Sequence, residues 1–287
     1  MRSLGIDVGV RKGLDLVLLS NTEAGEEVTI EETRRRVRPE QLPAIVAELS
    51  PDVVGIDSPP SWGSNGRSRA AERALREFGI QSFGTPSGNG GSNPFYAWME
   101  VGFQTFRAIS DVFPRYRSGR NVRGTALEVF PHASSVVLAG CLPHPEESKR
   151  RWRAAVLVGN GVDARKLRSA DQIDAALAAL TGLQALRGRF TALGDPLEGV
   201  IVVPSHALPP PPYRRCERSR RRDRQPHLPG LTPCECGDPA CTAMTKAEFA
   251  RGHDAKRKRL LWIRARDGDE AVRELARRGW DLPPEMR

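Results

Sequence analysis

The stretch VVGIDSPPSW occupies residues 53–62. Its first four residues are apolar and lead to Asp57, which predicts a short buried strand, and the prolines that follow end it. Residues 3–8 have the same character and carry Asp7 close to their end. A third β-prone segment, residues 125–130, also holds one acid between apolar neighbours. We therefore expect three buried strands that each carry a carboxylate.

The remaining segments predict how these strands are assembled. Residues 14–19 and 28–37 alternate well enough for two more strands, so the first three strands are expected to form an antiparallel meander. We also expect a strand at residues 200–203 and helices at residues 39–49, 66–78, 95–109, after Pro131 and at residues 169–183. This order is typical of an α/β or α+β mixed sheet with helices on its faces.

The acids Asp7, Asp57 and Glu128 need a physical explanation, because a buried carboxylate is costly unless it is paired, hydrogen-bonded or bound to metal. The last helix adds Asp171 and Asp174, which lie three residues apart and therefore on one helix face. Such a cluster repels itself, and one or two Mg²⁺ or Mn²⁺ ions would neutralise it. The sequence therefore predicts a catalytic divalent-metal site. Asp174 is preferred over Asp171, because Asp171 equally fits the start of the helix.

A carboxylate site of this kind suits phosphoryl chemistry. Two ions about 4 Å apart activate water and stabilise the leaving oxygen of an in-line displacement. A single Asp at a strand end is more often a turn former or a helix cap, so the prediction depends on the combination of acids. His132, four residues after Glu128, is expected to cap the following helix, with a proton-shuttle role as the alternative.

Six segments occur along the chain in a characteristic order: GIDVG, VVGIDSPPSW, RSRAAERALREFGI, NPFYAWM, ALEVFP and DQIDAALAAL. Together they resemble the domain of unknown function 429 family of predicted nucleases, over about the first 205 residues. The resemblance implies a ribonuclease H-like fold. It also implies that Asp7, Asp57 and Glu128 are the acids of the first, fourth and fifth strands. Asp171 and Asp174 match the D-x-x-D pair of the last helix, as in the related Holliday-junction resolvases.

The charged segment RSRAAERALREFGI supplies a second group of candidate residues. Arg69, Glu72 and Arg73 match an R-x-x-E-R helix of the family. The resemblance implies that this helix faces the site and binds phosphate or base of a substrate. A solvated helix face is the alternative for each of the three side chains.

Two further features lie near the expected site. Trp62 follows Asp57 closely in sequence and is a candidate for stacking on a base. Residues 83–94 form a loop rich in Gly, Ser, Asn and Pro between two predicted helices. Unstructured loops of this length are often functional, so we expect it to gate substrate access, with a plain surface excursion as the alternative.

The composition changes at residue 206, where a proline-rich run and then an arginine-rich run begin. We predict a nuclease domain at residues 1–205, a linker at residues 206–230 and a small helical module at residues 231–287. The module is predicted to hold a structural Zn²⁺ through Cys234, Cys236, Cys241 and His253. Free thiols in a small helical tail are the alternative.

Charge and cysteine usage limit the class of protein. Lys and Arg number 44 against 35 Asp and Glu, a net charge of +9. This balance favours nucleic acid as a partner, although a solvated basic surface explains it equally well. No apolar run reaches the ~20 residues that span a bilayer and no signal peptide is evident, so we expect a cytoplasmic protein without a membrane partner. Five cysteines, with Cys141 and Cys216 scattered and the other three clustered, favour metal ligation over a disulfide framework.

These observations lead to three hypotheses of function. The first is a metal-dependent nuclease that hydrolyses phosphodiester bonds at the carboxylate site. The second is a nucleic-acid-binding module of the same fold that has lost its chemistry. The third is a phosphotransferase of the actin and sugar-kinase superfold, because residues 5–9 resemble its first phosphate motif. A second such domain and an adenosine-binding glycine pair are not found in the sequence, so the nuclease is preferred.

Overall fold

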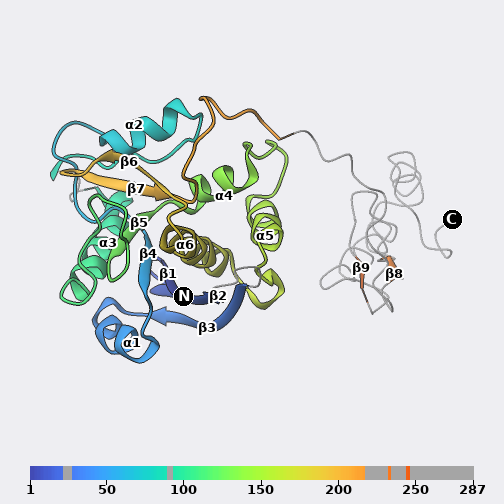
Figure 1. Cartoon of the computed structure of the whole chain (residues 1–287), viewed down its shortest axis with the longest axis horizontal. Coiled ribbons are helices and arrows are strands. Elements are labelled where there is room, and N and C mark those ends of the chain that lie inside the picture. Colours follow the sequence, from blue (N-terminus) through green and yellow to red (C-terminus); the bar gives the residue numbers. More distant parts are fainter. Residues whose placement is uncertain (22–27, 89–92, 217–231, 234–243, 246–287) are drawn as a thin grey trace, which may run out of the picture. The chain divides into compact units, whose positions relative to one another are not determined.

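The computed structural model describes residues 1–21, 28–88, 93–216, 232–233 and 244–245 (Figure 1). The chain divides into two compact units, Met1–Arg218 and Ser219–Arg287. The described part of the second unit is an antiparallel pair of short strands, β8 (Thr232–Pro233) and β9 (Met244–Thr245). The four predicted zinc ligands lie outside the described residues.

A seven-stranded mixed sheet forms the centre of the first unit, in the order β3-β2-β1-β4-β5-β7-β6 (Figure 1). The strands are β1 (Arg2–Asp7), β2 (Leu14–Asn21), β3 (Val28–Val37), β4 (Val53–Asp57), β5 (Ala126–Val129), β6 (Thr191–Asp195) and β7 (Gly199–Val203). The first three form the predicted antiparallel meander, and β4, β5 and β7 run parallel to β1. The sequence did not predict β6, which pairs with β7 as an antiparallel hairpin at the sheet edge.

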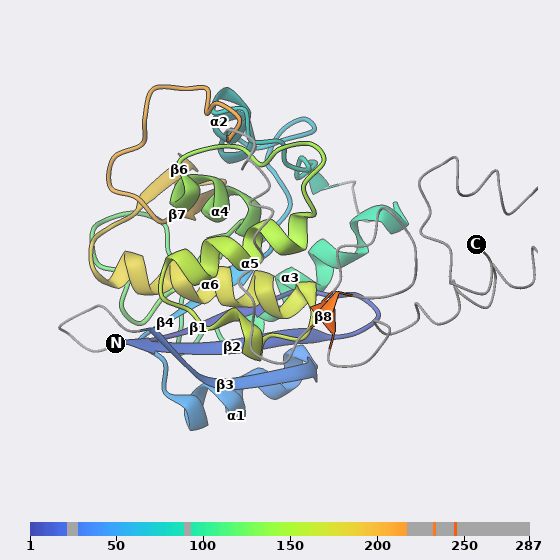
Figure 2. The ribbon, with the colours of Figure 1, turned by 90° about the vertical axis from the view of Figure 1, so that its right-hand side faces the viewer.

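Six α-helices of the described residues cover the sheet. They are α1 (Leu42–Leu49), α2 (Ala70–Glu77), α3 (Ala97–Ala108), α4 (Pro131–Ala139), α5 (Lys149–Gly159) and α6 (Ala170–Leu186). Helices α1 and α3 pack on one face of the sheet, and α6 packs on the other with α4 and α5 beside it (Figure 1). Figure 2 shows α5 and α6 on one side of β1–β3 and α1 on the other. The predicted mixed α/β class with helices on both faces is confirmed, although α5 had not been predicted separately. No helix in the described part of the chain is long and apolar enough to cross a membrane.

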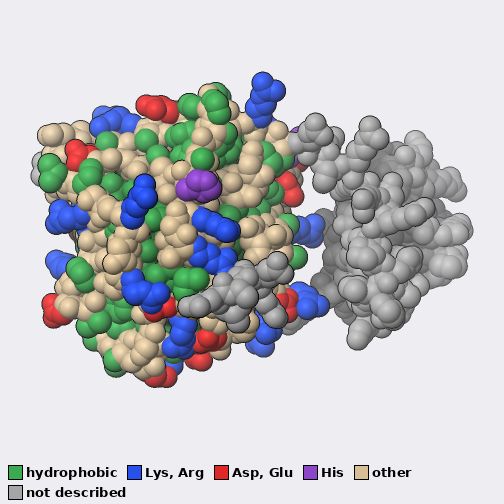
Figure 3. Space-filling model, viewed as in Figure 1, with side chains coloured by type: hydrophobic (Ala, Val, Ile, Leu, Met, Phe, Trp, Pro, Cys, Tyr) green, Lys and Arg blue, Asp and Glu red, His purple; other side chains and the backbone are tan. Residues whose placement is uncertain are grey.

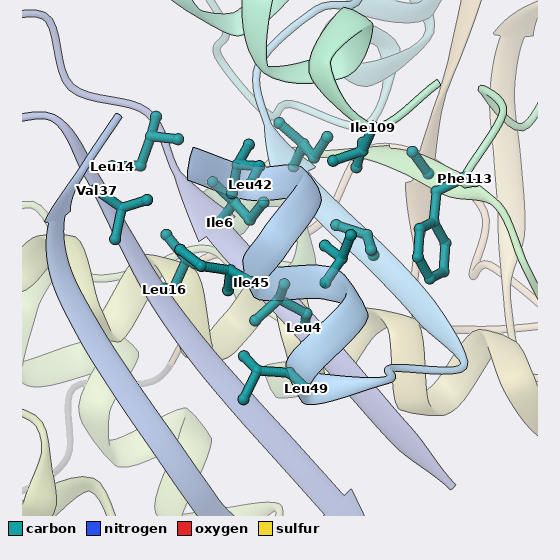
Figure 4. Close-up of a cluster of buried hydrophobic side chains, with 14 of the residues drawn as sticks. Leu4, Ile6, Leu14, Leu16, Val37, Leu42, Ile45, Leu49, Ile109 and Phe113 are labelled. Carbon is teal, nitrogen blue, oxygen red and sulfur yellow. The ribbon is translucent and has the colours of Figure 1, made fainter. Parts of the chain in front are cut away.

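Helix α1 shows how one face of the sheet is buried. Leu42, Ile45 and Leu49 recur at helical spacing, so they form one apolar face of the helix. That face packs in one cluster with Leu4 and Ile6 of β1 (Figure 4). Full burial of such a side chain contributes roughly 1.5–3 kcal/mol, so this cluster holds α1 firmly on the sheet.

Along β1 and β4, the residues that alternate with those of the α1 cluster point to the other face of the sheet, where α6 lies. Two of these residues are glycines. Gly5 and Gly55 are register partners on the two parallel strands. A Cβ atom on Gly5 would overlap the carbonyl oxygen of Ala175, and one on Gly55 would lie 2.6 Å from the carbonyl oxygen of Ala178. The backbone of α6 therefore lies directly against the backbones of β1 and β4, with alanines as its contact residues.

Residues 206–216, the first part of the predicted linker, belong to the first unit. Tyr213 is buried in an apolar cluster. The backbone N–H of Cys216 donates to the carbonyl oxygen of Leu142 at 2.8 Å. Cys216 is also joined to Cys141 by a disulfide, with their Cα atoms 5.0 Å apart. The two cysteines that the sequence left scattered are therefore partners, because the chain returns to the α4–α5 segment before it leaves the unit.

Substitution of Gly5 tests the close approach of α6. We expect Gly5→Ala to lower the free energy of unfolding by about 3 kcal/mol, because the added methyl group forces α6 away from the sheet. The matched control is Gly159→Ala, where an added Cβ meets no heavy atom within 4 Å. That variant should be neutral or stabilised by up to about 1 kcal/mol. Urea unfolding measures both, and equal stabilities of the two variants would refute this account of the packing.

Candidate metal site and adjoining chamber

Strands β1 and β4 and helix α6 bring three carboxylates together. Asp7 and Asp57 end adjacent parallel strands and are register partners. Asp174 lies near the start of α6, which packs on these strands. One carboxylate oxygen from each residue lies within 4.8 Å of the other two. We call Asp7, Asp57 and Asp174 the acidic triad.

The position of α6 is fixed by the residues that cap its first turn. The hydroxyl of Ser169 accepts a hydrogen bond from the backbone N–H of Gln172 at 3.0 Å, and the Gln172 side chain accepts one from the backbone N–H of Arg168 at 2.7 Å. This reciprocal arrangement satisfies N–H groups that the helix itself leaves free. The Ser169 hydroxyl also donates to Asp15 at 3.2 Å, and Asp15 is the register partner of Asp7 on β2. The cap therefore ties the start of α6 to the strands beneath the acidic triad.

Burial and mutual repulsion make the acidic triad hard to ionise. Burial raises the pKa of Asp7 to about 8, and the carboxylates of Asp174, Asp171 and Asp15 add to the shift. The pKa of Asp57 is raised well above its ordinary value by burial and then by Asp7 and Asp174. Burial also raises the pKa of Asp174. A cation among these oxygens would stabilise the ionised form of all three groups.

The donor atoms of the acidic triad fit a hard divalent cation. Carboxylate oxygens are the ligands that Mg²⁺ and Mn²⁺ prefer, whereas thiolates and imidazoles favour softer metals. The described residues offer three such oxygens, from Asp7, Asp57 and Asp174, within reach of one position. The structure therefore supports divalent-metal binding at this place in the fold.

Arg153 is a member of this site that the sequence analysis missed. It lies on α5, and its Nη1 group donates to both carboxylate oxygens of Asp174, at 2.6 and 2.5 Å. The positive charge opposes the effect of burial on the pKa of Asp174. The Arg153 Nε atom is buried and has no hydrogen-bond partner among the described residues. The site therefore contains one protein cation beside three carboxylates.

Asp171 and Asp174 occupy different environments, although both belong to the D-x-x-D pair. Asp171 lies in the first turn of α6 and forms an ion pair with Lys12 at 3.3 Å, and both side chains are accessible to solvent. It acts on the acidic triad through its charge, by raising the pKa of Asp7. Of the two acids, the structure places Asp174 in the group of potential metal ligands, in agreement with the preference from sequence.

Glu128 lies on β5 and is not a member of the acidic triad. Its neighbours Leu127 and Val129 pack on the α6 side of the sheet, so Glu128 points to the opposite face. Its register partner on β4 is Ile56, which is buried with α1 and α3. The alternation of side chains along the strands therefore separates Glu128 from Asp57.

Arg69 holds Glu128 in a buried network. Its Nη1 atom donates to Glu128 at 2.9 Å, its Nη2 atom contacts the other Glu128 oxygen, and its Nε atom donates to Glu72 at 2.9 Å. Thr85 also donates to Glu72, at 2.7 Å. Arg69 is only 1% exposed, whereas Arg73 is exposed and donates to a backbone carbonyl group. The polar groups of Arg69 and Glu72 are used within this network, and substrate binding by these three residues stays a prediction.

A cavity of about 280 Å³ connects the acidic triad with this network. Its wall includes Asp57, Asp174, Arg153, Arg69, Glu72, Glu128, Ser82, Phe83, Thr85, Trp98 and Met99. We call this cavity the chamber. Residues 83–88 and 93–94 of the predicted gating loop are described, and Phe83 and Thr85 of that loop line the chamber. Gating by the loop stays a prediction.

Trp62, predicted to stack on a base, packs within an aromatic cluster. Its ring makes edge contacts with Phe103 at 4.9 Å and with Tyr96 at 6.3 Å, as distances between ring centroids. The residues that line the chamber do not include Trp62, but they include Trp98 of α3. Trp98 is therefore the tryptophan that is placed to contact a ligand in the chamber.

His132 follows β5 in the first turn of α4 and is packed edge-on against Trp152, with ring centroids 5.9 Å apart. Its pKa is lowered to about 4, mainly because burial disfavours the charged ring and also because Arg153 and Lys149 lie nearby. The imidazole is therefore neutral at physiological pH. Its Nδ1 atom is buried without a hydrogen-bond partner in the described part of the chain.

The sequence matches the family model described as "Protein of unknown function (DUF429)" over residues 5–198. The chain belongs to the DUF429 family. The matched region includes the acidic triad and the Arg69 network, so these features lie in the part of the protein that defines the family. The search of curated proteins gives no match for this DUF429 protein. Among solved structures, the Thermus thermophilus RuvC structure aligns with a TM-score of 0.40 and 15% identity, over 66% of this chain and 97% of that chain.

The buried network of this DUF429 protein predicts that replacing Arg69 lowers the free energy of unfolding strongly, whereas replacing Arg73 changes it little. Arg69→Met leaves Glu128 and Glu72 buried without their cation, so we expect it to lower the free energy of unfolding by about 3–5 kcal/mol. Arg73→Met removes an exposed side chain and should change stability by less than about 0.5 kcal/mol. Urea unfolding of both variants checks this. A small effect for Arg69→Met would show that the network contributes little to the fold.

The raised pKa of Asp7 predicts a pH dependence of stability in protein freed of divalent ions by EDTA. The group has an ordinary pKa of 3.8 and a pKa of about 8 in the folded protein, so the folded protein keeps a proton that the unfolded chain has lost. Stability should therefore fall as the pH rises from about 4 to about 8. Asp7→Asn should make this dependence shallower, and Mg²⁺ should raise the urea midpoint of the parent protein most at the upper end of the range. An unchanged slope in Asp7→Asn would contradict the assignment.

Proposed function

We propose that this DUF429 protein is a metal-dependent nuclease of ribonuclease H-like fold. The acidic triad is the single observation that carries the proposal, because a cation would offset the repulsion among three half-buried carboxyl groups whose oxygens lie within 4.8 Å of one another. A hard divalent cation at such a site is suited to phosphodiester hydrolysis. Asp7, Asp57 and Asp174 are the residues proposed to hold it, with Glu128 and Asp171 outside the triad.

The order of the strands supports the ribonuclease H-like assignment. Three antiparallel strands, β1–β3, are followed by β4 and β5 parallel to β1, and a helix precedes each of these two strands. This is the order of elements that the family resemblance implies. Asp7 and Asp57 stand at the carboxyl ends of the central strands, the edge at which parallel sheets bind ligands.

The side chains around the acidic triad have distinct roles in the proposed reaction. The bound cation would neutralise charge on a phosphodiester group and lower the pKa of an attacking water. Asp7 and Asp57 hold fixed positions because their strands are paired in register. The Nη1 group of Arg153 donates a hydrogen bond to Asp174, while its Nε atom has no hydrogen-bond partner in the described part of the chain. We infer that the remaining N–H groups of Arg153 bind a non-bridging phosphate oxygen, for which a guanidinium group has the right shape and charge.

The charge of the protein supports nucleic acid as the substrate. Lys and Arg exceed Asp and Glu by 44 to 35 over the whole chain. Figure 3 shows Lys and Arg side chains spread over one face of the described unit, both across its middle and at its rim, with Asp and Glu among them. A phosphate polymer gains affinity from such a surface through the release of counterions. DNA and RNA share this chemistry, so both are included in the test.

Arg153 also favours a second candidate function, which is nucleic-acid binding without cleavage. Its guanidinium group already neutralises Asp174, as a metal ion would. A protein that has lost catalysis can keep its fold if an arginine compensates for the buried carboxylates. In this case, the protein would bind nucleic acid equally well with and without Mg²⁺ or Mn²⁺.

A cleavage assay with the full chain separates the two functions. Labelled single-stranded, duplex, hybrid and branched DNA and RNA substrates are incubated with the protein and Mg²⁺ or Mn²⁺. We expect cleavage of at least one substrate and a loss of at least about 100-fold in rate for Asp7→Asn, Asp57→Asn and Asp174→Asn, by analogy with the removal of other groups that stabilise charge at active sites.

The matched control is Asp171→Asn, which changes the same type of residue one turn away on α6. Its side chain is paired with Lys12 at the surface, so its rate should stay within a few-fold of the parent rate. Full activity in all three triad variants would refute the site. Binding without cleavage of any substrate would favour the second candidate.

A further inference from the structure

The chamber extends beyond the acidic triad into a part that the proposed hydrolysis does not use. Asp57, Asp174 and Arg153 form one region of its wall. Elsewhere the wall is formed by Phe83 and by Trp98 and Met99 near the start of α3. A ligand with a phosphate at the acidic triad can therefore reach a surface that is largely aromatic and apolar.

Two aromatic rings line this part of the chamber. Phe83 lies at the surface against another ring, and Trp98 belongs to a helix. Phe83 is 64% exposed, and its ring contacts that of Phe95 edge-on with centroids 5.2 Å apart. Trp98 is partly buried and belongs to α3, which is anchored in the core through Phe106. An exposed ring beside a partly buried ring offers a ligand an apolar surface to cover. Flat π-systems are the ligands that such rings bind best.

The polar residues of the chamber include one hydroxyl group without a hydrogen-bond partner in the described part of the chain. The Ser82 Oγ atom is buried and has no hydrogen-bond partner among the described residues. In contrast, Glu72 in the same wall accepts hydrogen bonds from Thr85 and from Arg69. A buried hydroxyl group without a partner costs free energy, and a ligand that bonds to it removes that cost. Ser82 therefore offers a donor and an acceptor to the polar edge of a ligand.

The volume of the chamber suits a ligand with one flat group. Its volume of about 280 Å³ lies just below the range of roughly 300–1,000 Å³ that is usual for small-molecule pockets. A base pair in a stacked duplex cannot enter such a space. A single nucleobase can enter it only after it leaves the stack, as in enzymes that bind a flipped base between aromatic side chains.

From these observations, we propose that the chamber binds one unstacked nucleotide. Its base lies against Trp98 and Phe83 and its polar edge bonds to Ser82, while its phosphate is directed to the acidic triad. The inference rests on the proposed nuclease function for the identity of the phosphate site, and it names the substrate class as single-stranded or locally unpaired nucleic acid. A free mononucleotide has the same chemistry, so the test includes it.

The test measures binding to the full chain with Asp57→Asn as a common background, so that cleavage does not consume the probe. The probe is 2-aminopurine, a fluorescent base that is quenched by aromatic stacking. It is placed in a single strand, in a fully paired duplex and in a duplex with one unpaired position, and it is also supplied as the mononucleotide. We expect saturable binding of the single strand and of the unpaired position, at least about tenfold tighter than binding of the paired duplex.

Two variants with matched controls assign the binding to the chamber. Trp98→Ala should weaken binding of the single strand about tenfold or more, whereas Val112→Ala, which changes a hydrophobic residue 64% exposed outside the chamber, should leave it unchanged. Ser82→Ala should weaken binding about three- to tenfold without loss of thermal stability, because its hydroxyl group has no partner to lose. Ser3→Ala removes another buried hydroxyl group without a partner and should leave binding unchanged.

The outcomes separate this inference from the proposed function. Equal binding of paired and unpaired probes, or unchanged binding in both Trp98→Ala and Ser82→Ala, would overturn the chamber assignment even if the parent protein cleaves nucleic acid. Binding that depends on Trp98 and Ser82 in a protein that cleaves nothing would support the chamber and count against the nuclease. Tighter binding of the mononucleotide than of the single strand would support the chamber with a free nucleotide as its ligand.

Discussion

The backbone of α6 lies directly against β1 and β4, and the candidate site depends on this contact. It is possible because Gly5 and Gly55 are register partners and leave no side chain between sheet and helix. A helix held away by ordinary side chains would carry Asp174 too far from the strand ends to join the two other carboxylates. The close packing therefore turns two strand acids, Asp7 and Asp57, into a three-residue site. The energy of the contact comes from buried apolar surface, which offsets the cost of bringing like charges together.

Two groups of charges that differ in balance point to opposite faces of the sheet and meet at the chamber. On the α6 face, three carboxylates meet one arginine, Arg153, so negative charge is in excess. On the opposite face, Glu72 and Glu128 share Arg69, and Arg115 adds a second positive charge near Glu128. The second group is nearly neutral, and Arg69 is hydrogen-bonded to both glutamates, which suits a rigid wall. The first group has more acidic than basic side chains, which suits the binding of a cation.

Much of the fold was predictable from local pattern. Alternating and apolar runs predicted the meander and the acid-bearing strands, and the spacing of Asp171 and Asp174 predicted that one of them reaches the site from a helix. The features that were missed depend on tertiary contacts. Which face of β5 carries Glu128 is decided by its register with β4, and a four-residue strand does not reveal that register. Arg153 is one of several basic residues at the start of α5, and only the packing of that helix selects it. The partnership of Cys141 with a cysteine 75 residues away depends on the return of the chain to the first unit.

The alternation of side chains along β1 and β4 restricts how the gene of such a protein can change in length. In both strands the glycine and the acid are two residues apart, so both point to α6. Insertion of one codon between Gly55 and Asp57 would turn the carboxylate to the face occupied by α1 and α3, and the same holds for β1. Insertions in the segments that follow the acids would leave both carboxylates in place. Divergence by insertion and deletion should therefore be confined to the connections, while the two-residue spacing within each strand persists in proteins that keep the site.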